Sequence, residues 1–155
     1  MRQAKKIVQT QVKLRAAKES DCRKFWEWRN ESATREASFD TSIIPYEIHE
    51  GWYAKRLLDP CSRLFVALNR SGEEIGYVRF QIRGHAAEIS VSLDRRFRGQ
   101  GLGPMVIKVG CDLVMQEPQV QQIIAQVKRD NPASFATFKK AGFAMRKDGK
   151  LAFAK

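Results

Sequence analysis

The stretch from Leu93 to Gly103 constrains the fold of this chain more than any other part of the sequence. An apolar strand runs into Arg98-Gly99-Gln100-Gly101-Leu102-Gly103, and a helix follows. Glycine tolerates positive φ angles and lets the backbone come close to a ligand, while the first N–H groups of a helix and its dipole favour an anion. We therefore expect a turn that binds phosphate between a strand and a helix.

Two common phosphate-binding motifs do not fit this stretch. A dinucleotide-binding fold needs GxGxxG within a βαβ unit, and a P-loop needs Gly-Lys-Ser/Thr. Here the order is Arg-x-x-Gly-x-Gly, and the strand before it reads as antiparallel. From these residues alone, a turn that is merely shaped by its glycines remains the alternative.

The rest of the sequence predicts an α+β fold with a mostly antiparallel sheet. Apolar residues alternate where we expect strands and recur at helical spacing where we expect helices, with Pro and Gly at the turns. In the first helix, Cys22, Phe25 and Trp26 form the apolar stripe and Trp28 lies off it. A polar loop follows this helix. Strands are expected at 11–16, 63–68, 74–82, 86–93, 121–128, 143–145 and 151–154, and helices at 21–30, 45–58, 102–115 and 131–141.

Length and composition favour one domain over residues 1–155, with residues 1–10 as a flexible N-terminal extension. No apolar stretch approaches the roughly 20 residues of a membrane helix, and no signal core follows the first residues, so we expect a cytoplasmic protein without membrane contact. Cys22, Cys61 and Cys111 are too few and too widely spaced for a disulfide framework or a zinc site. We expect no bound metal.

The net charge of +11 is concentrated at the C-terminal end of the chain. Residues 95–155 carry 12 basic and 4 acidic side chains, a difference of +8. Such a bias indicates an anionic partner, which can be a phosphorylated ligand or a nucleic acid. A basic surface that only confers solubility is the alternative.

Two blocks of this sequence resemble the GNAT superfamily of N-acetyltransferases. The pyrophosphate loop of that family is (Arg/Gln)-x-x-Gly-x-(Gly/Ala), and Arg98, Gly101 and Gly103 match it. The block from Asn131 to Phe143 resembles the family's later helix, with Asn at its start and Gly-Phe at its end. The resemblance implies a GNAT fold, a central mixed sheet of six to seven strands with about four helices on its two faces.

The resemblance also implies that acetyl-CoA is the cosubstrate. In that family the strand before the loop splays from its neighbour, so that backbone groups there bind the pantetheine arm and the acetyl group. Pro104 departs from the usual loop because it has no N–H to offer, which leaves more of the phosphate binding to Arg98 and Arg96. The residues expected at acetyl-CoA are Val91, Ser92, Leu93, Arg98, Gly99, Gln100, Gly101, Leu102, Gly103, Pro104, Asn131, Ser134 and Phe138.

Direct acetyl transfer needs a base for the amine, and Glu88 is the candidate. Strand alternation puts Glu88, Ser90 and Ser92 on one face, next to the expected acetyl site. His85 and His49 are weaker candidates, and a solvated carboxylate is the alternative for Glu88. Many family members carry a Tyr as acid for the leaving thiolate, but the matching position here is Phe138. The proton for the leaving thiolate must then come from another group, such as Ser134, Tyr77 or a water, or the thiolate leaves unassisted.

The N-terminal half resembles enzymes that acetylate the 4-amino group of nucleotide-linked deoxy-amino sugars in the pseudaminic acid pathway. That likeness implies acceptor contacts from Arg29, Asn30, Phe39, His49 and Trp52, including a diphosphate and a stacked ring. Helix packing is the alternative for the tryptophans. An acetyltransferase for a protein N-terminus or aminoacyl-tRNA and a non-catalytic acetyl-CoA-binding module remain competing functions. The sequence leaves open a monomer or a homodimer.

Overall fold

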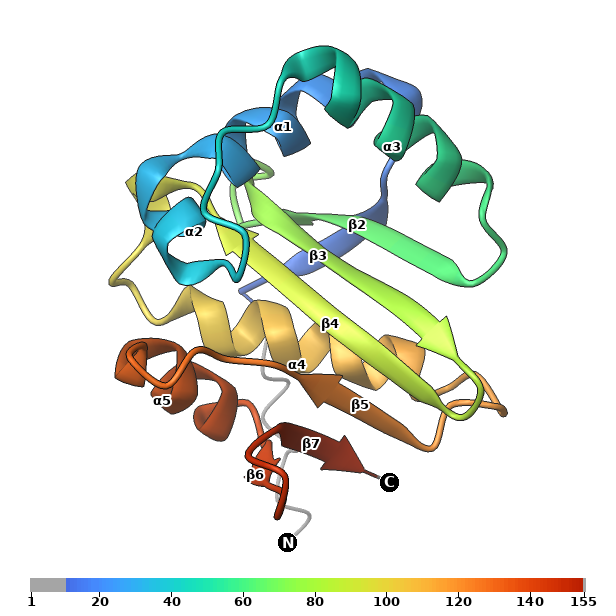
Figure 1. Ribbon diagram of the computed structural model, residues 1–155, viewed down its shortest axis with the longest axis vertical. Helices are drawn as coiled ribbons and strands as arrows, with labels where there is room; N and C mark the ends of the chain where they lie inside the picture. Colours follow the sequence, from blue (N-terminus) through green and yellow to red (C-terminus); the bar gives the residue numbers. More distant parts are fainter. Residues whose placement is uncertain (1–10, 155) are drawn as a thin grey trace, which may run out of the picture.

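The computed structural model describes residues 11–154 and places a seven-stranded sheet at the centre of the chain (Figure 1). The expected extension at residues 1–10 lies outside the described residues. The strands follow the order β1-β2-β3-β4-β5-β7-β6. Their bounds are Lys13–Ala16 (β1), Ser62–Leu68 (β2), Glu74–Arg83 (β3), Ala86–Leu93 (β4), Gln122–Ala125 (β5), Ala144–Met145 (β6) and Leu151–Ala154 (β7).

Among the strands of residues 11–154, only β4 and β5 pair in parallel, and the other neighbouring strands pair antiparallel. Five α-helices accompany the sheet within the described residues. The α+β class and the mixed sheet of the GNAT fold are therefore confirmed. The helices are Cys22–Asn30 (α1), Ser32–Ala37 (α2), Tyr46–Leu58 (α3), Leu102–Val114 (α4) and Pro132–Lys140 (α5).

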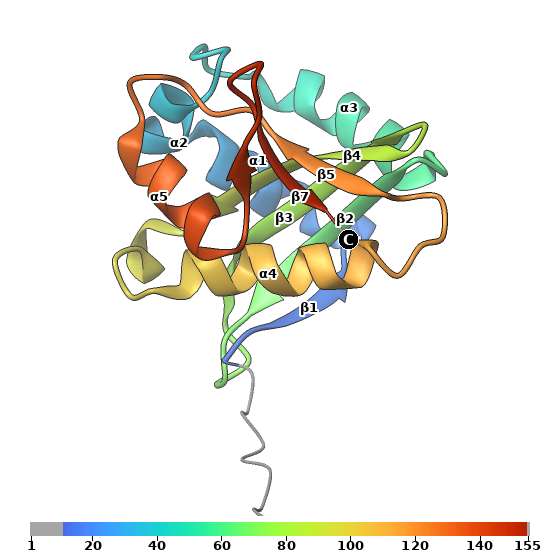
Figure 2. The same cartoon turned by 90° about the horizontal axis from the view of Figure 1, so that it is seen from below.

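The sheet separates two apolar clusters. On one face, α1 and α3 bury Phe25 and Tyr53 against Leu64, Val66 and Tyr77 of the strands. On the other face, α4 covers the larger cluster, and α5 lies beside the N-terminal end of α4 (Figure 2). The alternation expected for β4 is confirmed, because its odd-numbered residues face the α4 cluster while Glu88 and Ser90 face the side of α1.

The structure corrects two expectations for the N-terminal helices. Trp28 is only 4% exposed, whereas Trp26 is partly buried and donates its indole N–H to the carbonyl of Ile44 at 2.7 Å. The buried stripe of α1 therefore follows the spacing i, i+3, i+6 from Cys22 rather than i, i+3, i+4. In addition, α2 occupies part of the expected polar loop, which raises the helix number from four to five.

Within the described residues, every helix is too short or too polar to cross a membrane.

Gly76 allows β3 and β4 to approach each other where β4 ends. A Cβ atom on Gly76 would lie 2.2 Å from the backbone oxygen of Ser92 and 2.9 Å from the Cα of Leu93. Real Cβ atoms do not approach backbone so closely, so any side chain here must push the two strands apart. The end of β4 therefore depends on this glycine.

We expect Gly76→Ala to destabilise the protein by about 3 kcal/mol, because the clash is with backbone that cannot rotate away. Gly72→Ala is the control, since Gly72 also has positive φ but its Cβ would meet nothing within 4 Å. We expect that control to cost about 1 kcal/mol. Denaturant unfolding measures both changes, and equal losses would contradict the role of close approach.

Candidate functional site

The site begins where β4 separates from β5. The two strands pair only from Ala86 with Gln122 to Glu88 with Ile124, although β4 continues to Leu93 alongside β3. The remaining part of β4 lies opposite α5, which follows β5 in the chain (Figure 1). Two cavities lie along this part of β4, one on each side of Val91.

The larger cavity, about 710 Å³, extends from the glycine turn to α5. Gly99 and Gly101 have φ angles of +72° and +75°, as expected from the sequence, and a Cβ on either would meet nothing within 4 Å. Gly101 is the residue before α4, so the helix N-terminus points into this open space. The cavity is lined by Val91, Ser92, Leu93, Arg98, Gly99, Gly101, Leu102, Gly103, Pro104, Asn131, Ser134 and Phe138, among others.

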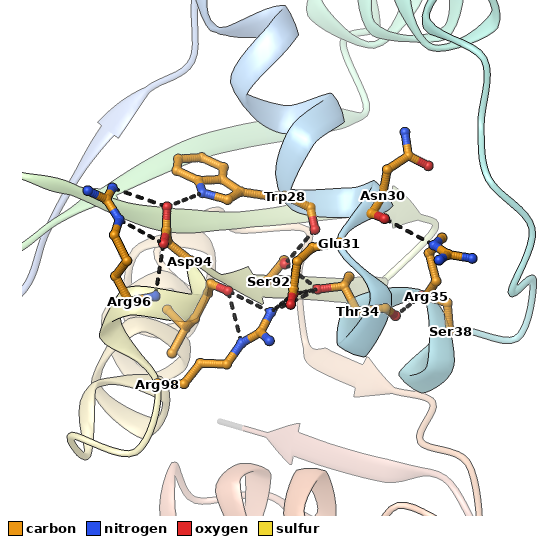
Figure 3. A network of polar contacts seen from close by, with 11 residues as sticks. Trp28, Asn30, Glu31, Thr34, Arg35, Ser38, Ser92, Asp94, Arg96 and Arg98 are labelled. Atoms are coloured by element: carbon orange, nitrogen blue, oxygen red, sulfur yellow. Dashed lines mark hydrogen bonds and ion pairs between the residues drawn. The ribbon is translucent and has the colours of Figure 1, made fainter.

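Arg98 does not extend a free guanidinium toward this cavity. Its Nε and Nη2 donate to the carbonyl of Leu93 at 3.1 and 2.9 Å, and Nη2 also bonds Glu31 and the hydroxyl of Thr34 (Figure 3). Arg98 thus ties the end of β4 to α2. Nε and Nη2 are therefore engaged within the protein, and the expected role of Arg98 in phosphate binding stays a prediction.

Arg96 is also engaged, with Asp94. The Arg96 guanidinium and amide both donate to Asp94, and the Trp28 indole donates to the same carboxylate at 3.0 Å (Figure 3). Burial favours a higher pKa for Asp94, but these hydrogen bonds outweigh it and hold the pKa well below the usual range. Gln100 bonds the carbonyl of Arg96 and does not line the cavity.

A hydrogen bond between two hydroxyls holds α2 against β4. Ser92 and Thr34 share a hydrogen bond of 3.1 Å, and Ser92 also approaches the carbonyl of Trp28. On α5, the side chain of Asn131 caps the helix by accepting from the Ser134 amide at 3.1 Å. Ser92 and Asn131 thus line the cavity, but their side chains form hydrogen bonds with other groups of the protein.

The smaller cavity, about 280 Å³, lies on the other side of Val91 and contains Glu88. The Glu88 carboxylate has no hydrogen bond or ion pair within residues 11–154. Arg29 and Phe39 line the same cavity, and Phe39 is 68% exposed at its edge. The two cavities share the residues Thr34, Ala37, Val91, Ser134 and Phe138.

Three residues expected at the acceptor lie outside this cavity. His49 is 1% exposed, and its Nε2–H donates to the carbonyl of Cys22 at 2.8 Å; burial lowers its pKa. Asn30 uses its amide on both backbone groups of Ile44, so it positions the loop before α3. Trp52 does not line the cavity, and its ring centroid lies 5.2 and 5.0 Å from the guanidinium carbons of Arg29 and Arg79, which do. The structure therefore does not bring the side chains of His49, Asn30 and Trp52 to the smaller cavity.

Sequence reasoning did not identify Arg79, Thr34 or Ala37 as cavity residues. Arg79 carries a detectable signal, because it is a charged residue that interrupts the apolar run of β3 between Val78 and Phe80. Thr34 and Ala37 carry none, since α2 is short and lacks an apolar stripe.

A family model described as "Acetyltransferase (GNAT) domain" matches residues 11–144. The chain belongs to the GNAT acetyltransferase family. The fold and enzyme class expected from the two sequence blocks are thereby confirmed. A comparison with curated proteins finds no match.

Solved GNAT structures share this fold. A spermidine N-acetyltransferase from Vibrio cholerae in complex with CoA and spermine has a TM-score of 0.84 and 20% identity, with 94% of this chain and 96% of that chain covered. The aminoglycoside acetyltransferase AAC(6')-Ib with acetyl-CoA and paromomycin has a TM-score of 0.79 and 22% identity, with 93% of each chain covered. The expectation of acetyl-CoA as cosubstrate agrees with these complexes. Neither is a nucleotide-sugar enzyme.

The open space at Gly101 generates a prediction about acetyl-CoA. In the wild-type protein, acetyl-CoA should raise the thermal midpoint, because a ligand that binds only the folded state stabilises it. Gly101→Val should abolish that rise by filling the turn. Gly149→Val is the control, because Gly149 has a similar φ of +84° and open surroundings but lies in the turn between β6 and β7. A folded Gly101→Val variant that keeps the full rise would contradict the site.

Proposed function

We propose that this GNAT acetyltransferase moves the acetyl group of acetyl-CoA directly onto a primary amine held beside Glu88. The observation that carries the proposal is the meeting of the two cavities at Val91 and Phe138. The thioester would lie in the larger cavity and the amine in the smaller one, on opposite sides of this junction. The pyrophosphate would lie on the backbone amides around Gly101.

The proposed reaction starts with loss of a proton from the acceptor ammonium, because only the free amine has a lone pair. Glu88 takes this proton, directly or through a water. The amine nitrogen forms a bond to the acetyl carbon, the carbon–sulfur bond breaks, and the thiolate leaves with the electron pair. The nitrogen then loses its second proton, which reaches the thiolate directly or through water, and the products are the neutral amide and free CoA.

Direct transfer is supported by the positions of the cysteines. Cys22 and Cys111 are buried, and Cys61 is exposed but lines neither cavity. Burial raises the pKa of the Cys111 thiol to about 12, which disfavours the nucleophilic thiolate. A covalent acetyl-cysteine is therefore not part of the proposal.

For the departing sulfur, Ser134 is the candidate hydrogen-bond donor. Phe138 is 5% exposed at the junction and has no proton to give. Ser134 lines both cavities, and no hydrogen bond to its hydroxyl occurs within the described part of the chain. A serine hydroxyl can stabilise the thiolate by hydrogen bonding, and solvent can supply the proton. Tyr77 lines only the amine cavity.

For the acceptor we propose the 4-amino group of a UDP-linked deoxy-amino sugar. Arg29 and Phe39 at the smaller cavity support this acceptor, because a guanidinium suits a diphosphate and an exposed ring suits stacking. The related structures bind spermine and paromomycin, so spermidine and paromomycin are the appropriate competing acceptors.

Incubation with acetyl-CoA and each acceptor, followed by mass spectrometry, tests this choice. We expect the amino sugar to gain the mass of one acetyl group and to react faster than spermidine or paromomycin. Faster acetylation of either polycation would contradict the proposed acceptor. Absence of turnover with any amine would favour a binding module.

Glu88→Gln should lower kcat by about 10²-fold or more with little change in acetyl-CoA affinity, because the amide cannot accept the proton. The loss should shrink as pH rises toward the pKa of the acceptor amine, since solvent then supplies free amine. Steady-state rates against pH measure this, with Glu47→Gln on the exposed surface of α3 as control. A Glu88→Gln rate within about threefold of wild type at neutral pH would rule out this base.

A further inference from the structure

Three arginine side chains surround the indole of Trp52. The guanidinium carbons of Arg79, Arg29 and Arg56 lie 5.0, 5.2 and 5.7 Å from the ring centroid. Arg56 reaches Asp59 at 3.4 Å. Arg79 and Arg29 form no hydrogen bond or ion pair within residues 11–154, and both line the smaller cavity.

Arg79 lacks the partner that a partly buried cation normally has. It projects from β3 opposite Ser90, and its Nε atom is buried without a hydrogen-bond partner. Burial lowers the pKa of Arg79, yet an arginine remains protonated under ordinary conditions. Removing such a charge from water costs free energy, and an opposite charge in contact would offset that cost. The fold keeps the guanidinium but supplies no anion in contact with it.

The carboxylates in the cavity do not fill this role. Glu88 attracts Arg79 but forms no ion pair with it, and Asp40 accepts hydrogen bonds from Ser42. The face of Trp52 holds the guanidiniums in place, which keeps their donors oriented for a planar or tetrahedral anion. The free donors of Arg79 and Arg29 therefore fit a group brought by the acceptor.

The sheet register sets the distance between this group and the reacting amine. Arg79 pairs with Ser90, and Glu88 lies two residues before Ser90 on β4. Diagonal neighbours of this kind lie about 7 to 8 Å apart, and their Cβ atoms are somewhat closer. An anion at Arg79 and an amine at Glu88 can thus belong to one small molecule.

We propose that Arg79, together with Arg29, forms an anion subsite that selects amines carrying a carboxylate or phosphate group over polycationic amines. The inference rests on the proposed acetyl transfer beside Glu88. It differs from the proposed acceptor, because any amine with a suitably placed anion satisfies it. A polycation would instead bring a second ammonium beside two unpaired guanidiniums.

Matched amines test the selection and distinguish the two kinds of anion. The pairs are O-phosphoethanolamine with ethanolamine and β-alanine with β-alaninamide, and spermidine is the polycation. We expect kcat/KM to be at least about tenfold higher for the charged member of one pair, and that pair identifies the anion. Equal values within both pairs, or spermidine as the best acceptor, would overturn the proposal.

Variants distinguish two roles for Arg79, binding the anionic group of the acceptor and assisting Glu88 as the base. Arg79→Gln should raise KM for the anionic amine about tenfold or more, while KM for acetyl-CoA and the kinetics of the neutral partner stay within about twofold. Arg29→Gln should act in the same direction, and Arg79→Lys should restore part of the loss. Arg83→Gln is the control on the same strand, because Arg83 is exposed and lies outside this cavity. An equal fall in kcat for both members of a pair would overturn the subsite.

Direct measurement of anion binding tests the subsite even if the protein acetylates none of these amines. With the protein saturated by CoA, calorimetry should detect inorganic pyrophosphate binding to wild type and to Arg83→Gln, and a loss of at least about tenfold in Arg79→Gln. Binding without any acetylation would uphold the subsite while refuting the proposed function. No binding to CoA-saturated wild type would overturn the subsite.

Discussion

The site depends on the loss of one hydrogen-bonding partner by β4. Beyond Glu88 the strand pairs with β3 alone, so its other edge presents backbone groups toward the cavities instead of toward β5. Unpaired backbone groups inside a protein need partners, and a ligand with amides and carbonyls can provide them. The strand remains in place because Gly76 lets β3 approach its last residues closely.

Ion pairs and hydrogen bonds then connect this strand end to the N-terminal helices. Arg98 bridges β4 and α2, while Asp94 receives donors from Trp28 of α1 and from Arg96 (Figure 3). The Arg98–Glu31 and Trp28–Asp94 contacts are partly buried, so they are less screened than surface contacts, whereas the Arg96 guanidinium is exposed. The arginine of the glycine-turn motif thereby acts on the neighbouring helix, whereas the glycines leave room for a ligand.

The sequence was sufficient to predict the order of the strands and helices, the positive φ angles of Gly99 and Gly101, and the face of β4 that carries Glu88. These features follow from local patterns. The stripe of α1 was misplaced because spacings of three and four residues lie on adjacent faces, and only tertiary packing decides between Trp26 and Trp28. The helix α2 was missed because bonds from distant residues, such as Ser92 to Thr34, hold it.

The positions of the site residues also depend on tertiary contacts that local sequence patterns do not reveal. His49 and Arg98 have side chains suited to phosphate, but their distant partners at Cys22 and Glu31 cannot be read from spacing. Arg79 is the converse case, since its lack of a partner becomes visible only in three dimensions.

The six residues of α2 form a wall common to both cavities, through Thr34 and Ala37. A shift of this helix on binding of one substrate therefore changes the space open to the other. By thermodynamic linkage, if the bound cosubstrate changes the affinity for the acceptor by some factor, the bound acceptor changes the affinity for the cosubstrate by the same factor. Such coupling gives the enzyme a means to favour the ternary complex over either partial complex.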